Sequence, residues 1–506
     1  MGIADKLSGS GSASIQILSG TAQNVVGVGV AALGTLVAQI LIGRTLGNAG
    51  FGLVTVVTQA AFVTSFLTRA GMDMAVLRTV ATATGEGRTN ALRTVVARAA
   101  LIAAAASTVV ALAAVAGADA LRSLLSLDPI RGRGAIQAAA AGLPFLALAN
   151  VWLAATRGLK IMRYTLYVFW AGQPLVWIVL MLVGWRVSES PSSAAFAYST
   201  SWAWAAAAAW WCWRRESRSW RTEQPERGAT SSLFRYAGPR APAALFSQVL
   251  FWADLFVLTR YVGDAEVGIY SAALRAGQVV VLFLTSVNLM FSPYVADLHN
   301  RGEIAQLDRL FKRLTRWTLA ATLPGFLLLA VAPASVLRLF GGTFADGRTA
   351  LLILLVGQFV NIATGSVGFV LIMAGRTGWD LALYAASLAL DVGLALYLCP
   401  RYGIAGAAAA NAFTFGISNV ARLVLVKRLV GIQPYDRRYG RLLAPAVASG
   451  AIMMIAHGAV GGGWGTELVA TAVAGGLAYV VVFAAVGLTA DERRGARVLL
   501  TKARSA

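Results

Sequence analysis

RTLGNAGFGL at residues 44–53 and RYVGDAEVGI at residues 260–269 are two copies of one short polar stretch. An arginine, a glycine, an alanine and a second glycine recur at the same positions without a gap. Each copy separates two apolar segments that are long enough to cross a bilayer as helices. Tight turns favour Gly, Asn and Asp, which tolerate positive φ, so two unrelated turns would explain part of the likeness. The matched position between apolar segments favours a true internal repeat.

The composition is that of a membrane protein. The 506 residues are 58% hydrophobic and 13% charged, whereas an ordinary soluble domain carries roughly twice that charged fraction. Apolar runs of about 18 residues or more recur from Ile15 to Leu488. We therefore predict an all-α polytopic membrane protein. About fourteen transmembrane helices are expected, near residues 15–42, 49–72, 97–117, 135–156, 165–184, 193–213, 237–259, 267–296, 317–337, 349–374, 380–399, 404–426, 442–460 and 467–488.

The repeat predicts how these helices are organised. Six helices separate the two copies, and an even number preserves orientation, so the halves should be two parallel six-helix pseudo-repeats around a central cavity. This plan is typical of alternating-access transporters. The loop after the second helix lacks the charged G-x-x-x-D-R motif that is usual in the major facilitator class. The expected parts are a cytoplasmic N-terminal tail (1–14), a first six-helix bundle (15–213), a basic cytoplasmic linker (214–236), a second six-helix bundle (237–427), additional helices 13 and 14 (428–489) and a cytoplasmic tail (490–506).

The charge distribution predicts the orientation. The net charge is +21, and most Lys and Arg residues fall on the side of the N-terminal tail, so both termini should be cytoplasmic. The basic runs WRRESRSWR (213–221) and KRLTR (312–316) are then orientation signals that can also touch anionic lipids. This pattern argues against a nucleic-acid partner. Cys212 and Cys399 lie in expected helices near opposite membrane faces, which supports neither a disulfide nor a metal site.

Ionisable side chains inside the expected helices are candidates for function, because a charge at the bilayer centre costs at least about 2.5 kcal/mol. Asp254 and Arg275 flank the second polar stretch, roughly 12 Å below it on consecutive helices. They could form a buried ion pair that only fixes helix packing. Alternatively, Arg275 faces the cavity and is held by Asp254 until a phosphate displaces the carboxylate.

A second group of charges lies at the cytoplasmic end of the second expected helix. Arg69, Asp73 and Arg78 follow one another at spacings of four and five, which places them broadly along one side of a helix. They could receive a cytoplasmic headgroup, with Asp73 as an ion-pair or gating residue. The alternative is that the arginines simply extend their charges to the membrane interface.

Arg240 and Asp391 are isolated candidates. Arg240 lies between Pro239 and Pro242, which should bend the start of the seventh helix, so the residue is either part of a gate or an ordinary flanking charge. Asp391 has no obvious local partner in its expected helix. It is a proton or sodium coupling site, the partner of a distant arginine, or a protonated core carboxyl.

Several stretches, in their order, resemble the polysaccharide-type lipid flippases, a family that shares a superfamily with multidrug and toxin extrusion transporters and the lipid II flippase. GRTLGNAGFGL (43–53) and GMDMAVLRTVA (71–81) resemble its first two helices. The second half agrees more fully. Its matching stretches are DLFVLTRYVGDAEVGIYSAALRAG (254–277), VLRLFGGTFADGRTALLILLVGQFVN (336–361), LIMAGRTG (371–378) and PRYGIAGAAAANAF (400–413). One departure is Asp391, where an Asn is commoner in the family.

The resemblance implies that the chain moves an undecaprenyl-pyrophosphate-linked oligosaccharide from the inner to the outer leaflet of the bacterial cytoplasmic membrane. It implies a cationic cavity, for which Arg69, Arg240 and Arg275 are candidates. Membrane lipids and glycosyltransferases or a polymerase of the same pathway are the implied partners. No catalytic set and no cofactor are expected, while coupling to H⁺ or Na⁺ stays open.

Two other functions remain as alternatives. The first is an ion-coupled drug or metabolite exporter of the same fold, for which acidic rather than basic intramembrane residues would be typical. The second is a membrane glycosyltransferase or polymerase. The longest expected outer loop, near 118–134, is short and contains no paired carboxylates, which argues against an enzyme.

Overall fold

The structure is a computed structural model that describes residues 10–85, 89–220, 233, 237, 242, 244–489 and 492. These residues are mainly helical and contain no β-strand. Among them, nine helices are long and apolar enough to cross a membrane, or ten if the bent pair Asp264–Val279 and Leu282–Asn288 is one span. The all-α polytopic fold is therefore confirmed. The number of fourteen helices is not confirmed by this criterion in the described part of the chain.

The chain forms two compact units. The N unit comprises Ala22–Arg275 and Thr377–Thr414. The C unit comprises the described parts of Met1–Thr21, Ala276–Arg376 and Phe415–Ala506. The boundaries differ from those of the two expected bundles, because segments with Asp254 and Asp391, expected in the second bundle, belong to the N unit.

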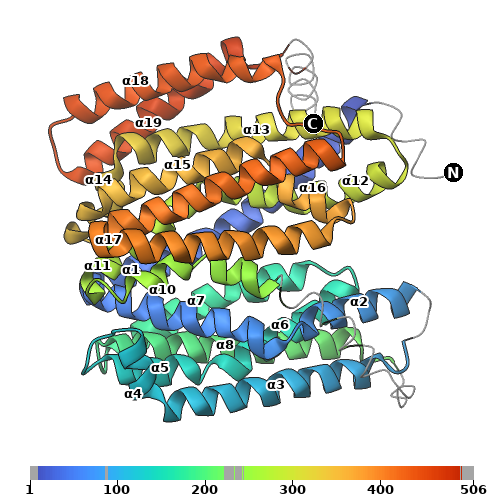
Figure 1. Ribbon diagram of the computed structural model, residues 1–506, viewed down its shortest axis with the longest axis vertical. Helices are drawn as coiled ribbons and strands as arrows, with labels where there is room; N and C mark the ends of the chain where they lie inside the picture. The colour runs from blue at the N-terminus through green and yellow to red at the C-terminus, as the bar shows by residue number, and fades with distance from the viewer. Residues whose placement is uncertain are drawn as a thin grey trace, which may run out of the picture. The chain divides into compact units, whose positions relative to one another are not determined.

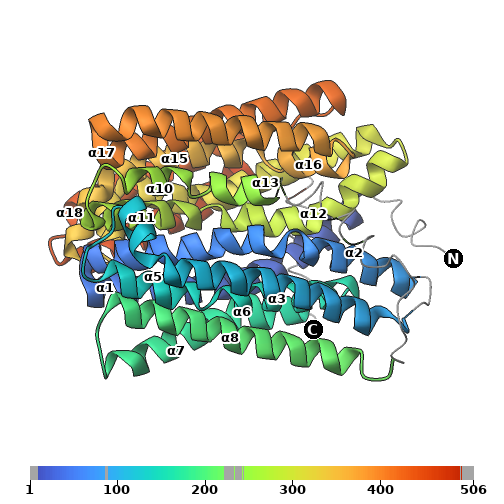
Figure 2. The same cartoon turned by 60° about the horizontal axis from the view of Figure 1, so that its bottom comes forward.

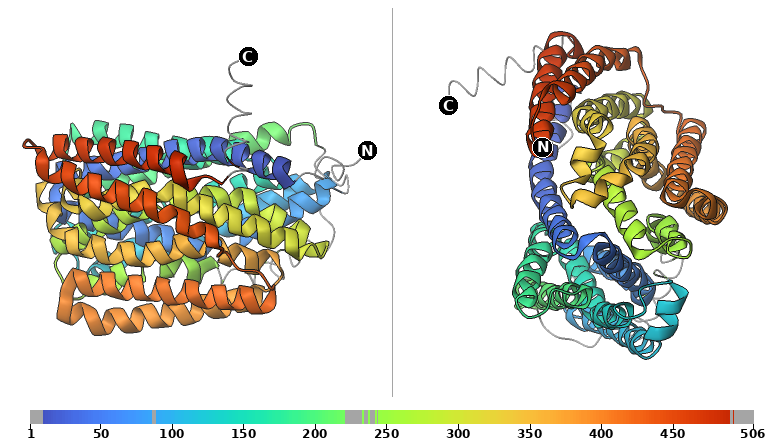
Figure 3. Two further views of the ribbon diagram at one scale, coloured as in Figure 1. Left: turned by 90° about the horizontal axis from the view of Figure 1, so that it is seen from above. Right: turned by 90° about the vertical axis from the view of Figure 1, so that its left-hand side faces the viewer.

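Most helices of the N unit run roughly along one axis, and the right-hand view of Figure 3 looks along them. In Figure 1, α3, α6 and α8 lie alongside one another, and Figure 2 shows α7 beside α8. The elements of this unit are α1 (Ser10–Arg69, from residue 22), α2 (Met72–Gly85), α3 (Leu92–Ala116), α4 (Ala118–Leu124), α5 (Gly132–Ala140), α6 (Leu143–Gly158), the π-helix η2 (Thr165–Gly172), α7 (Gln173–Trp185), α8 (Pro191–Glu216), α10 (Ala253–Leu258), α11 (Asp264–Val279, to residue 275) and the first part of α17 (Thr377–Leu429).

In the C unit, α13 packs on α12, α15 and α18, and α18 packs on α19. A π-helix follows the last long helix of this unit. The elements are α12 (Leu282–Asn300), α13 (Ile304–Val331), α14 (Pro333–Leu337), the 3-10 helix η3 (Gly342–Gly347), α15 (Arg348–Thr364), α16 (Val367–Met373), the second part of α17, the 3-10 helix η4 (Arg437–Leu442), α18 (Leu443–Ala459), α19 (Trp464–Val482) and the π-helix η5 (Phe483–Gly487).

The two longest helices each contain a glycine with positive φ. Gly47, in the first polar stretch, has φ 68°, and Gly403, in the PRYG turn, has φ 52°. Only glycine adopts such angles without strain. Each glycine lies between two helices that the sequence predicts, so α1 and α17 can each contain two membrane spans.

The two copies of the polar stretch pack against each other through their second glycines. A Cβ added at Gly268 would lie 1.9 Å from the carbonyl oxygen of Asn48, and one at Gly52 would lie 2.2 Å from that of Asp264. Asn48 and Asp264 occupy the same position in the two copies. The contact is therefore reciprocal, as a contact across a twofold axis requires. The glycines recur because two backbones meet where no side chain fits.

Alanine faces bring the helices of the N unit together. Ala99 and Ala103 on α3 and Ala147 and Ala155 on α6 are fully buried in one hydrophobic cluster. Small residues of this kind let helix backbones approach closely inside a membrane protein, where dispersion contacts stabilise the packing. The same packing positions α2 against α6. The charged residue Arg157 lies at the end of α6.

Candidate functional site

The first candidate site lies where α1 ends. Arg69 is the last residue of α1 and is only 2% exposed. The chain then breaks at Ala70 and Gly71, which have φ 46° and 75°, before α2 begins. The break places Asp73 beside Arg69, with 3.3 Å between Nη1 and Oδ2. A side chain at Gly71 would be strained at this φ and would also meet the backbone of Ala237.

The guanidinium of Arg69 is only partly satisfied. Its Nε donates to the carbonyl oxygen of Ser65 at 3.0 Å, and its Cζ lies 4.1 Å from the ring centre of Phe66. Its buried Nη2 has no hydrogen-bond partner among the described residues. Orphaned donors of a buried cation are costly. The side chain is therefore held in place and still has a donor to offer to an acceptor.

A second arginine shares this site. Arg157, at the end of α6, interacts electrostatically with both Asp73 and Arg69. The site thus holds two cations, one buried and one half-buried, and one carboxylate, and it keeps an excess of positive charge. Such a surplus inside a membrane protein favours a phosphate or carboxylate ligand, since a guanidinium binds both in a bidentate manner.

Sequence reasoning missed Arg157. Its expected helix stops one residue earlier, so the residue looked like an ordinary interfacial cation. The only available signal was the positive charge at a helix end in ATRG (155–158). The packing of α6 on α2, which brings Arg157 to Asp73, has no signature in the sequence.

The second candidate site is a buried acidic cluster. Asp254 on α10 and Asp391 on α17 are both fully buried and interact electrostatically with each other. The hydroxyl of Tyr270 on α11 donates to Oδ2 of Asp254. Asn411 and Thr414, both on α17, lie beside Asp254 and Asp391 respectively.

Several oxygens of this cluster lack donors. Within the described residues, Oδ1 of Asp254, both carboxylate oxygens of Asp391 and the hydroxyl of Thr414 have no hydrogen-bond partner. Two carboxylates this deeply buried cannot both carry an uncompensated charge, because desolvation and mutual repulsion oppose it. The cluster therefore suits either a bound proton or a small cation that prefers oxygen ligands.

Arg275 belongs to neither site. Its Cζ lies 4.6 Å from the ring centre of Trp252, and it interacts electrostatically with Tyr198. The structure contains no ion pair between Arg275 and Asp254, whose hydrogen-bond donor is Tyr270 instead. A cation on an aromatic face is stabilised without a carboxylate.

The structure brings together Arg69 with Asp73, and Asp254 with Asp391, on separate parts of the N unit. It thereby shows that Asp391 does have a neighbour, which no local pattern revealed. Arg240 lies outside the described residues. No group of three or more His, Cys, Asp or Glu residues able to hold a metal ion occurs in the described ranges.

A model of the polysaccharide biosynthesis protein family matches residues 17–299, which is more than half of the sequence. The chain belongs to the polysaccharide biosynthesis protein family. Among its curated relatives is the probable low-salt glycan biosynthesis flippase Agl15 of Haloferax volcanii, with 22% identity over 203 residues. That match covers 40% of this family member and 43% of the relative, so the chain spans less than half of the relative's length.

Solved structures agree with this family member in fold. The lipid II flippase MurJ in an inward closed conformation has a TM-score of 0.69 at 13% identity, covering 91% of this chain and 97% of that one. An inward-facing multidrug resistance transporter of the MATE family gives 0.67 at 14% identity, covering 83% and 98%. The chain therefore shares its fold with both transporters, as the sequence resemblance predicted.

Proposed function

We propose that the chain is a flippase that moves an undecaprenyl-pyrophosphate-linked oligosaccharide from the inner to the outer leaflet of the bacterial cytoplasmic membrane. Family membership, the glycan flippase among its relatives and the MurJ-like fold support transport of a glycan-bearing lipid rather than catalysis. The observation that carries the proposal is the buried Arg69, whose Nη2 has no partner in the described chain and which lies in a site where Arg157 adds a second positive charge.

The chemistry of the substrate matches this site. A pyrophosphate presents several anionic oxygens, and two guanidinium groups bind such oxygens through charge-assisted hydrogen bonds. Asp73 would hold Arg69 in place until the phosphate replaces it. The exchange is favourable only for an anion, so the site discriminates against the cationic substrates typical of drug exporters.

The orientation follows from the basic residues. Because Lys and Arg gather on the side of the N-terminal tail, both termini are placed in the cytoplasm, and the Arg69 site lies near the cytoplasmic face. A headgroup would then meet it first from the inner leaflet. Alternating access of the two repeats would carry it outward, with glycosyltransferases or a polymerase of the same pathway acting before and after.

The experiment measures the movement of a fluorescent pyrophosphate-linked oligosaccharide lipid in proteoliposomes. Arg69→Gln should reduce the initial rate at least about tenfold, because a charged hydrogen bond contributes roughly 1.5–3 kcal/mol. Arg133→Gln removes an exposed arginine from the same unit and is the matched control. Equal rates for both variants would remove Arg69 from the mechanism. If Arg69→Gln abolished the flux of a cationic dye and left lipid movement unchanged, the result would favour the drug-exporter function.

The acidic cluster supports ion coupling within the same proposal. A cation or proton that binds between Asp254 and Asp391 would relieve their repulsion, and its release would restore it. Asp391→Asn should therefore make lipid movement independent of an imposed Na⁺ or pH gradient while the protein remains folded. If the variant responds to both gradients as the native protein does, the cluster is a structural feature only.

A further inference from the structure

The N unit contains a pocket that is separate from both sites described above. It has a volume of about 540 Å³ and is bounded by α3, α6 and α8. This volume lies within the range of ordinary ligand pockets. Arg69, Asp73 and Arg157 do not line it, and neither do Asp254 and Asp391.

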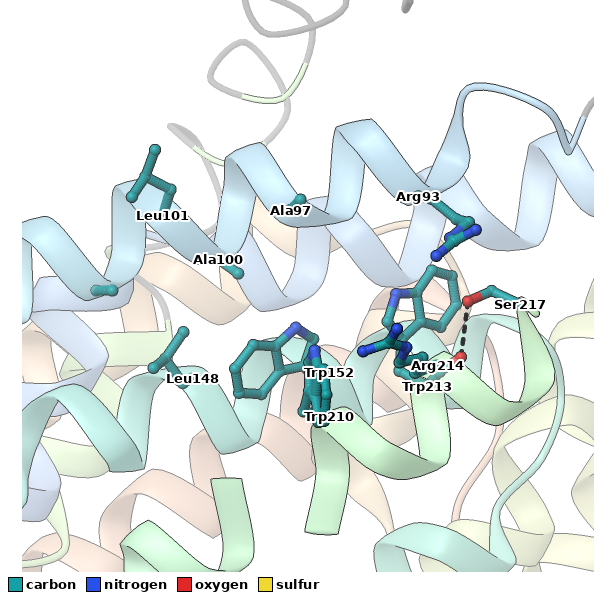
Figure 4. A pocket seen from close by; sticks show the side chains of 11 residues that line it. Arg93, Ala97, Ala100, Leu101, Leu148, Trp152, Trp210, Trp213, Arg214 and Ser217 are labelled. Carbon is teal, nitrogen blue, oxygen red and sulfur yellow. Dashed lines mark hydrogen bonds between the residues drawn. The ribbon is translucent and has the colours of Figure 1, made fainter. Parts of the chain in front are cut away.

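One end of the pocket is basic. Arg93, near the start of α3, and Arg214, near the end of α8, lie at this end together with Trp213 and Ser217 (Figure 4). The hydroxyl of Ser217 donates to the carbonyl oxygen of Trp213 at 2.8 Å, which fixes the last turn of α8. None of the described residues that line the pocket is acidic. This end therefore favours an anion.

The other end is apolar. Leu101 and Leu148 lie there in Figure 4, and Ala97, Ala100 and Ala104 continue the lining along α3. Small side chains at spacings of three and four leave a shallow groove along one face of the helix. Ala97 and Leu101 are exposed, so the groove opens on the outer surface of these helices. In a membrane, such a surface faces lipid chains.

Tryptophan side chains lie between the two ends. Trp152 and Trp210 line the middle of the pocket, and the Cζ of Arg214 lies 5.0 Å from the ring centre of Trp210. Tryptophan is enriched where the hydrocarbon region meets the headgroups, because its ring is apolar and its N–H is polar. The pocket thus changes from polar to apolar along its length, as a phospholipid does.

We propose that this pocket binds an anionic glycerophospholipid of the leaflet that faces the basic end of the N unit. The phosphate would lie between Arg93 and Arg214, and one acyl chain would follow the alanine groove of α3. Basic pockets between membrane helices bind anionic headgroups by this chemistry. A soluble phosphate would bind the arginines and leave the groove without a ligand. A zwitterionic lipid would occupy the groove, but the two cations would contribute little to its binding.

The test uses native mass spectrometry of the full-length protein in detergent, titrated with phosphatidylglycerol or phosphatidylcholine. The native protein should retain one phosphatidylglycerol molecule at least about tenfold more tightly than phosphatidylcholine. The double variant R93Q/R214Q should lose this preference. R98Q/R215Q removes the same charge from the same two helices outside the pocket lining, and it should keep the preference.

A second variant tests the groove while both arginines remain. Ala104→Trp fills the apolar end and should weaken the binding of phosphatidylglycerol by a similar factor. Glycerol phosphate should not compete with phosphatidylglycerol for the native protein. Thermal unfolding without added lipid verifies that each variant folds. If the two double variants lost the preference for phosphatidylglycerol equally, diffuse surface charge would explain that preference and the proposal would be overturned. Full binding by Ala104→Trp, or no preference in the native protein, would also overturn it.

Discussion

The contact between the repeated glycines leads to a quantitative prediction. Gly268→Ala places a methyl group 1.9 Å from the carbonyl oxygen of Asn48 and 3.0 Å from the backbone nitrogen of Gly52. Ordinary van der Waals contact begins at about 3.4 Å. The first distance is therefore about 1.5 Å too short, and the obstacle is backbone, which no side-chain rotation relieves.

Two opposing effects decide the sign. Alanine is a better helix former than glycine by about 0.8–1.0 kcal/mol, so an open helical site would be stabilised. Overpacking a close contact costs roughly 1–3 kcal/mol and sometimes more. Because the whole α1–α11 crossing must separate to accept the methyl group, we expect the cost to exceed the gain. Gly268→Ala should therefore destabilise the protein.

The assay is the apparent midpoint of thermal unfolding of the purified protein in detergent. Gly393→Ala is the matched control, because Gly393 is an exposed helical residue of α17 in the same unit and a Cβ there meets nothing within 4 Å. The midpoint should fall by at least about 2 °C for Gly268→Ala and stay equal or rise for Gly393→Ala. A Gly268→Ala midpoint at or above that of the control would refute the argument that backbone contact selected the repeated glycines.

Three further predictions concern single interactions. Tyr270→Phe removes the hydroxyl that donates to the buried Asp254, and should lower the free energy of unfolding by about 1–3 kcal/mol, measured in denaturant; an unchanged value would show that the carboxyl is protonated or solvated. Ser190→Ala removes the N-cap of α8 and should cost about 1 kcal/mol in the same assay, whereas Ser190→Gly should cost less. Burial raises the pKa of Glu492, but hydrogen bonds from a neighbouring backbone N–H and from Arg316 outweigh it, so the folded pKa lies below the usual 4.5. The Arg316–Glu492 pair should therefore stabilise the fold above pH 4.5 and be lost as the pH falls through the lower, folded value, and Glu492→Gln should remove this part of the pH profile of the unfolding midpoint.

The fold was predictable because its signals are local. Long apolar runs predict helices, and glycines such as Gly47 and Gly403 predict breaks between them. Both signals depend only on residues that are consecutive in the sequence. The resemblance to glycan flippases was likewise readable as an order of short stretches, and the family match confirms it. The polar stretch was identified as a repeated turn, but the reason for its second glycine appears only when the two copies meet.

The candidate sites were only partly predictable. The spacing of Arg69 and Asp73 predicted that both lie on one side of a helix, and the structure brings them together across the break at Ala70 and Gly71. Arg157 joins them through the packing of α6 on α2, and Tyr270 rather than Arg275 reaches Asp254. Sequence reasoning paired the residues of opposite charge on consecutive helices, whereas the rotation of each helix about its axis decides which side chains face one another.

The sequence by itself determined that the chain is helical, that it spans a membrane several times and that one turn is repeated, because apolar length, charge and glycine act on the backbone where they stand. Only the tertiary structure decided that the repeated glycines meet, that two buried carboxylates lie near each other and that Arg157 comes near the Arg69–Asp73 pair. These are contacts between segments far apart in the chain, and they depend on helix rotation and close packing, for which a linear order of residues carries no direct signal.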